Sequence, residues 1–164
     1  MTWPETPPAW WVVGTLLIVG CQDSGPQLVS DLRILRMMQC QECQAGERRA
    51  VIAMRDTAVA ELRQLLLNGP PLAFVSRLDS VLRAPIGLPI SPGDTPHVAS
   101  SATVKLLLED YHTMYQVRAS YALGGIGTDS AKQALCAGKA QPFQRREVRE
   151  AIDSSLGLAG GTCP

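Results

Sequence analysis

The sequence predicts an all-α protein. Aromatic residues make up 5% of its 164 residues, whereas alanine and leucine are abundant, a composition typical of helices that pack through small side chains. Apolar residues recur at helical intervals along most of residues 31–158. Prolines and glycines gather between these periodic segments, where helices have to end. We therefore expect short antiparallel helical hairpins that pack side by side.

An apolar run, AWWVVGTLLIVG, occupies residues 9–20 and is followed by Cys21. The run is too short to cross a bilayer as a helix, which needs about 20 residues, but it matches the hydrophobic core of a signal peptide. Together with Cys21, its last residues, LIVG, resemble the lipobox of bacterial lipoproteins. The resemblance implies that residues 1–20 form a lipoprotein signal peptide and that Cys21 is acylated. The alternative is a buried N-terminal helix in which Cys21 is a core thiol.

The lipoprotein resemblance also implies a location. The mature protein would be held in the bacterial cell envelope by its lipid, on the periplasmic or extracellular face of a membrane. Gln22 stands where the class has Asp as its inner-membrane retention signal, which favours the outer membrane in a diderm bacterium. Residues 21–30 are mostly polar and are expected to form a tether. The formal net charge of zero gives no reason to expect nucleic acid as a partner.

Residues 31–158 are expected to form the helical domain, and its first helix begins near residue 31. The segment 46–67 has the pattern of two helices that are broken at Arg55, and the Gly-Pro-Pro that follows ends the pair. The next helix, over 72–83, is expected to bury one face. This face consists of Phe74, Val75, Leu78, Val81 and Leu82.

A proline-rich segment then interrupts the helices. Residues 85–97, PIGLPISPGDTPH, cannot continue a helix and predict a surface loop. A helix resumes near Val98, and the last helix follows Pro142, which suits a first helical turn. Residues 159–164 are expected to be a C-terminal tail.

Residues 115–138 form the hairpin that defines the fold class. Gly127 can adopt the left-handed conformation that ends a helix, and Thr128 or Asp129 can cap the next helix. The Ala-Leu-Gly-x-Ile-Gly motif at 122–127, with the Ala-x-x-Ala-Leu after it, resembles a HEAT repeat of the short kind found in bacterial proteins. The resemblance implies a short right-handed stack of helical hairpins, a HEAT-like α-solenoid, that binds a partner or assembles with it. The buried stripe of the first helix would consist of Tyr115, Ala119, Ala122, Leu123 and Ile126.

Four cysteines follow the predicted lipid site: Cys40, Cys43, Cys136 and Cys163. An even number suits two disulfides in an oxidising compartment. We favour the pairs Cys40 with Cys43 and Cys136 with Cys163, and the other two connectivities stay open. In a cytosolic protein all four would be free thiols. Cys40-x-x-Cys43 lacks the βαβ context of a redox pair, and we expect no metal site.

The predicted function is that of a lipid-anchored, non-catalytic interaction or assembly module. We expect no catalytic residue, no cofactor and no small-molecule substrate. Tyr111, Tyr115 and Arg118 are candidate contacts to an unknown protein partner, although tyrosines at helical spacing also suit a helix core. The alternative is a HEAT-like enzyme, or an enzyme subunit, of the lyase-related type. A cleft with converging His97 or His112 would favour the enzyme, whereas a smooth groove lined by small residues would favour the interaction module.

Overall fold

The computed structural model describes residues 32–40, 44–85, 98–142 and 145–163, and within these ranges its regular structure is entirely helical. This confirms the predicted all-α class. The seven helices are α1 (Leu32–Gln39), α2 (Gln44–Ala53), α3 (Asp56–Asn68), α4 (Leu72–Arg83), α5 (Ser101–Ile126), α6 (Asp129–Lys139) and α7 (Arg146–Leu158). The predicted signal peptide at 1–20, the tether at 21–30 and all of the 85–97 loop except Pro85 lie outside the described residues.

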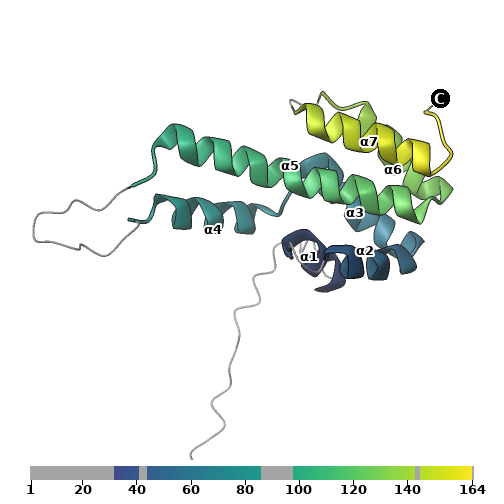
Figure 1. Cartoon of the computed structure of the whole chain (residues 1–164), viewed down its shortest axis with the longest axis horizontal. Coiled ribbons are helices and arrows are strands. Elements are labelled where there is room, and N and C mark those ends of the chain that lie inside the picture. The colour runs from purple at the N-terminus through teal and green to yellow at the C-terminus, as the bar shows by residue number, and fades with distance from the viewer. Residues whose placement is uncertain (1–31, 41–43, 86–97, 143–144, 164) are drawn as a thin grey trace, which may run out of the picture.

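Helix α5 is the central element and contacts each of the other six helices. Figure 1 shows α6 and α7 on one side of its C-terminal half and α1 and α2 on the other. Helix α4 lies along the N-terminal half of α5, and the two helices project together away from the rest (Figure 1). The core therefore surrounds the C-terminal half of α5.

Helix α4 departs from the predicted pattern. None of its residues is fully buried, and Val81, expected on the buried face, is 61% exposed. The other four residues of the predicted face, Phe74, Val75, Leu78 and Leu82, are half-buried, so the face is as predicted but its burial is only partial. The physical reason is its position: α4 packs along α5 beyond the other helices, so its apolar side chains are covered from one side only.

The turn between α5 and α6 follows the predicted chemistry. Gly127 adopts the left-handed conformation, with φ 66° and ψ 5°, and its N–H donates to the carbonyl of Leu123 over 3.1 Å. The Thr128 hydroxyl accepts from the N–H of Ala131 at 3.4 Å, which caps α6. Both local predictions are confirmed.

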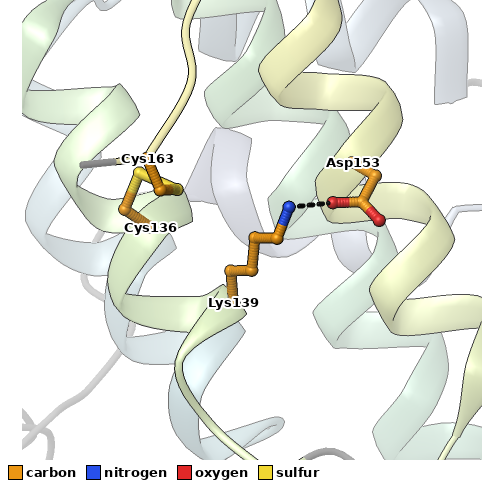
Figure 2. The surroundings of a disulfide bond; sticks show 4 residues. All are labelled: Cys136, Lys139, Asp153 and Cys163. Carbon is orange, nitrogen blue, oxygen red and sulfur yellow. Dashed lines mark ion pairs between the residues drawn. A yellow bond between two sulfur atoms is a disulfide. The ribbon is translucent and has the colours of Figure 1, made fainter.

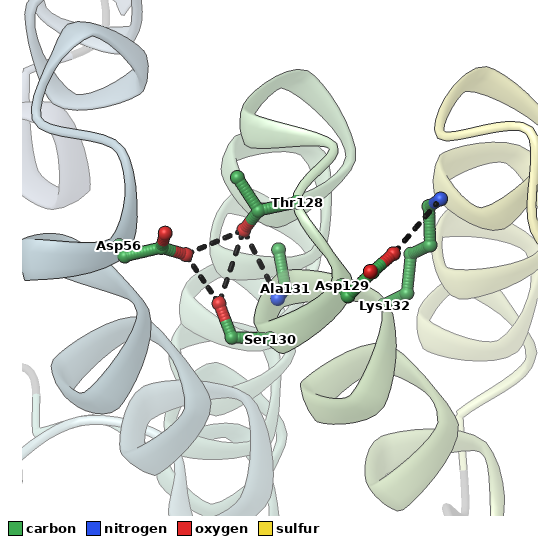
Figure 3. Close-up of polar contacts among 6 residues, drawn as sticks. All are labelled: Asp56, Thr128, Asp129, Ser130, Ala131 and Lys132. Atoms are coloured by element: carbon green, nitrogen blue, oxygen red, sulfur yellow. Dashed lines mark hydrogen bonds and ion pairs between the residues drawn. The ribbon is translucent and has the colours of Figure 1, made fainter.

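The turn between α2 and α3 contains Arg55 at φ 52° and ψ −133°, a conformation that favours glycine. The next residue, Asp56, joins this turn to the start of α6 (Figure 3). Its carboxylate accepts from the Thr128 hydroxyl at 2.6 Å and also from the hydroxyl of Ser130. The hydrogen bonds from Ser130 and Thr128 hold the pKa of Asp56 below its usual value. Two turns that are remote in sequence are thus tied at one end of the molecule.

The core is built from small and aliphatic side chains around α5. Leu123 is fully buried, as predicted, whereas Ile126 is only partly buried against the same cluster. Gly124 allows α7 to approach closely, because a Cβ at this position would lie 2.7 Å from the Cβ of Ser155. The other buried apolar residues of the cluster are Ile34, Met37, Met38, Val51, Ala58, Val59, Leu62, Leu65, Leu66, Tyr115, Ala119, Ala122, Ala131, Ala134, Leu135, Val148, Ile152 and Leu156.

Candidate functional site

An open groove of about 490 Å³ runs along α5, and we refer to it as the α5 groove. One wall consists of Met37 from α1 and Arg48 from α2. The opposite wall consists of Arg145 and Glu147 at the start of α7. The floor is one face of α5, formed by Asp110, Thr113, Met114, Val117, Arg118 and Tyr121.

Arg118 fixes the first wall. Its guanidinium donates to the main-chain carbonyl of Met37 at 3.3 Å and to that of Met38. These carbonyls belong to the last turn of α1, where main-chain carbonyls lack N–H donors from their own helix. Burial lowers the pKa of Arg118, and its proximity to Tyr115 opposes this shift. The contact holds the end of α1 against α5.

Arg145 fixes the second wall. This residue precedes α7, and its guanidinium lies 3.3 Å from a carboxylate oxygen of Glu109 and 3.0 Å from one of Asp110. Both acidic residues belong to α5, so the two ion pairs join the start of α7 to the floor of the groove. The charges of Arg145 and Asp110 are therefore already paired with each other within the chain.

The two tyrosines predicted as partner contacts lie on the side of α5 that packs against the core. Tyr115 is fully buried, and its hydroxyl lies 3.1 Å from that of Tyr111, with the rings edge to face. Tyr111 is half-buried, and burial, together with the hydrogen bond between its hydroxyl and that of Tyr115, raises its pKa. Neither ring lines the α5 groove, whereas Tyr121, one of the tyrosines of the same helix, does. Of the three predicted contacts, only Arg118 reaches the groove.

The structure describes three of the five cysteines. Cys136 at the end of α6 and Cys163 in the tail form a disulfide, as predicted, with their Cα atoms 5.5 Å apart. Figure 2 shows this bond beside the ion pair between Lys139 and Asp153, at 2.8 Å, which also joins α6 to α7. Cys40 is disulfide-bonded as well. The predicted lipid site, Cys21, and the predicted partner of Cys40, Cys43, lie outside the described residues.

His112 does not line the α5 groove. The ring of His112 packs against Gly69 at the end of α3, so that a Cβ on Gly69 would lie 2.1 Å from ring atom Cε1. His97 lies outside the described residues. Across the described ranges, no group of three or more His, Cys, Asp or Glu side chains is placed to hold a metal ion. The helices in these ranges also include none that is long and apolar enough to span a membrane.

The α5 groove combines apolar and charged side chains. Met114, Val117 and Tyr121 offer surface on which an apolar side chain could be buried, while arginines and carboxylates stand around them. Thr113, a hydroxyl in the floor, donates to the carbonyl of Glu109 at 2.9 Å within its own helix. This arrangement suits the binding of a polypeptide with mixed apolar and charged residues. No protein-family model, curated protein or solved structure matches the chain.

Proposed function

We propose that this chain is a lipid-anchored, non-catalytic interaction or assembly module of the bacterial cell envelope, and that it binds a protein partner in the α5 groove. The single observation behind the proposal is the composition of the groove. Its floor presents Met114, Val117 and Tyr121 between two walls that carry exposed charges. Protein interfaces have this plan, with an apolar and aromatic centre and a polar rim.

The helix contacts support a HEAT-like arrangement. In a stack of hairpins, each first helix contacts the next first helix, and each second helix contacts the next second helix. Helix α2 contacts α5, and α5 contacts α7, as successive first helices would. Helix α3 contacts α6, as successive second helices would. Arg55, between α2 and α3, and Gly127, between α5 and α6, both have a positive φ. Helix α4 and the start of α5 then form an insertion between two repeats.

The disulfides support export from the cytosol. Such bonds persist in oxidising compartments and are rare among cytosolic proteins. The bond between Cys136 and Cys163, together with the oxidised state of Cys40, therefore fits an envelope protein. The lipobox-like residues that end at Cys21 give the means of anchoring.

Photo-crosslinking in intact cells tests binding in the groove. A benzoylphenylalanine placed at Met114 should give a discrete crosslinked product, because Met114 lies in the floor of the groove. The same probe at Gln133, which is exposed on α6, serves as the matched control and should give none. Equal labelling from both positions, or no product from Met114, would contradict the proposed binding face.

The anchor needs a separate test. Labelled palmitate should be incorporated into the parent chain and lost from Cys21→Ala, and the variant should leave the membrane fraction. Label retained equally by Cys21→Ala would show that the lipobox resemblance is misleading. This result would leave the groove experiment unaffected.

A further inference from the structure

The apolar floor of the α5 groove is part of a longer apolar face of α5. Leu106 and Leu107 come about two turns before Met114, on the same face of the helix, and do not line the groove themselves. Leu106 is 52% exposed and Leu107 40% exposed, so this face stays open beyond the walls. We refer to the apolar residues of this face as the α5 stripe, which consists of Leu106, Leu107, Met114, Val117 and Tyr121. The stripe extends over about 22 Å, because each helical residue rises about 1.5 Å.

The polar side chains within the stripe already have partners in the chain. The carboxylate of Asp110 lies 3.0 Å from the guanidinium of Arg145. The hydroxyl of Thr113 donates to the carbonyl of Glu109 at 2.9 Å. The stripe therefore offers a partner mainly apolar surface.

The backbone of the partner has to be satisfied as well. An extended segment bound over the stripe would need a strand to pair with, and the described ranges contain helices only. Its N–H and carbonyl groups would then lie unpaired against apolar side chains, which is costly. A helix satisfies its own backbone and presents apolar side chains at the spacing of the stripe. A flat bilayer surface could touch Leu106 and Leu107 but not a floor that lies between two walls.

The charges on the two walls differ in sign. Arg48 stands on the wall formed by α1 and α2, and Glu147 stands on the wall formed by α7; both side chains are exposed. Among the described residues, neither forms an ion pair. Arg118 and Arg145, by contrast, are already bound within the chain. A complementary partner therefore carries acidic residues on the side toward α2 and basic residues on the side toward α7.

We propose that the occupant of the α5 groove is an amphipathic α-helix of about four turns from another protein, packed lengthwise on the α5 stripe. One flank of this helix is acidic and faces Arg48, and the other flank is basic and faces Glu147. The inference rests on the proposed function of the groove and names the kind of partner that it binds. A single helix can enter between the two walls and reach the floor.

Photo-crosslinking at the two ends of the stripe measures the conformation of the partner. Benzoylphenylalanine is placed at Leu107 or at Tyr121 of the full chain in intact cells, and the captured residue of the partner is mapped by mass spectrometry. The two positions are 14 residues apart in α5, which is about 21 Å. A helical partner should be captured at sites about 14 residues apart in its own sequence. An extended partner would be captured at sites only about 6 residues apart.

Reversal of a wall charge tests the predicted flanks. With benzoylphenylalanine at Met114, Arg48→Glu should lower the yield of the crosslinked product about fivefold, since the acidic flank then meets a like charge. Arg49→Glu is the matched control: it changes the net charge equally, but Arg49 is exposed on α2 and does not line the groove. Reversal of the acidic residues on the captured helix of the partner should restore the yield of Arg48→Glu.

The outcomes separate this inference from the proposed function. One protein captured from both ends of the stripe, at sites about 14 residues apart, supports the helix. Sites about 6 residues apart, no product from Leu107, or a product between two copies of this chain overturns it. Equal yields from Arg48→Glu and Arg49→Glu overturn the charged flanks. In these cases the product from Met114 still marks the groove as an interaction site, whereas no product from Met114 means that the proposed function of the groove fails as well.

Discussion

The guanidinium of Arg118 donates a hydrogen bond to the main-chain carbonyl of Met37 over 3.3 Å, across 81 residues of sequence. The contact joins the floor of the α5 groove to its first wall. This hydrogen bond therefore contributes, with the packing of α1 on α2 and α5, to holding that wall in place.

Replacing Arg118 with Leu should destabilise the protein by about 1 to 2 kcal/mol, because the carbonyls of Met37 and Met38 lose a charged donor. Arg118→Lys keeps a charge but presents one compact donor group, so an intermediate loss is expected. Urea unfolding measures both variants. Equal stability of Arg118→Leu and the parent would mean that α1 is held by other contacts.

Leu123 tests the core around α5. Leu123→Ala should cost about 2 to 5 kcal/mol, since the side chain is fully buried and its removal leaves a cavity. Leu158→Ala provides the matched control, because Leu158 is 74% exposed and should change stability by less than about 0.5 kcal/mol. Similar melting temperatures for the two variants would place the buried face of α5 elsewhere.

The strained turn at Arg55 gives a prediction of opposite sign. Arg55→Gly should stabilise the protein by about 1 kcal/mol, because glycine adopts the observed φ of 52° without steric cost. The matched control is Arg63→Gly in the exposed middle of α3, which should instead cost about 1 kcal/mol. If Arg55→Gly destabilises as much as Arg63→Gly does, the turn is not strained.

His112 predicts how stability depends on pH. Burial against Gly69 lowers the pKa of His112 below its ordinary value of 6.5. The folded state then binds its proton less readily than the unfolded state does. The stability contributed by the neutral ring is fully present above pH 6.5 and is lost as the pH falls through the folded-state pKa.

His112→Gln should remove this part of the pH dependence. Melting curves recorded at a series of pH values from 7.5 downward compare the variant with the parent, and His97 is present in both. The parent should lose more stability than the variant on acidification below pH 6.5. Parallel curves would show that protonation of His112 carries no penalty in the folded state.

Local signals in the sequence predicted the helices and their turns well. Gly127 and Thr128 act on their immediate neighbours, so their roles could be inferred without the tertiary structure. The burial of α4 could not be predicted in this way. The spacing of its apolar residues indicates which side chains share a face. It does not indicate whether a second layer of helices covers that face, and Val81 is exposed.

The groove was less predictable because its parts are far apart in the sequence. Met37, Arg48 and Arg145 come from three separate segments and converge only through packing on α5. Helical spacing alone cannot distinguish Tyr115, which is buried, from Tyr121, which lines the groove. The seven-residue spacing of Met114 and Tyr121 was the available signal, and it becomes informative only when one face of α5 is known to be open.

The central claim, that the α5 groove is an interaction face, is tested most directly by the native size of the protein in solubilised cell envelopes. We expect the parent chain to migrate in a native gel as a species larger than the monomer. Met114→Lys should shift it to the monomer position, because a charged side chain then occupies the apolar floor of the groove, whereas Gln133→Lys on α6 should not. If a folded Met114→Lys chain migrates at the same position as the parent, whether as a monomer or as a larger species, the α5 groove is not the interaction face.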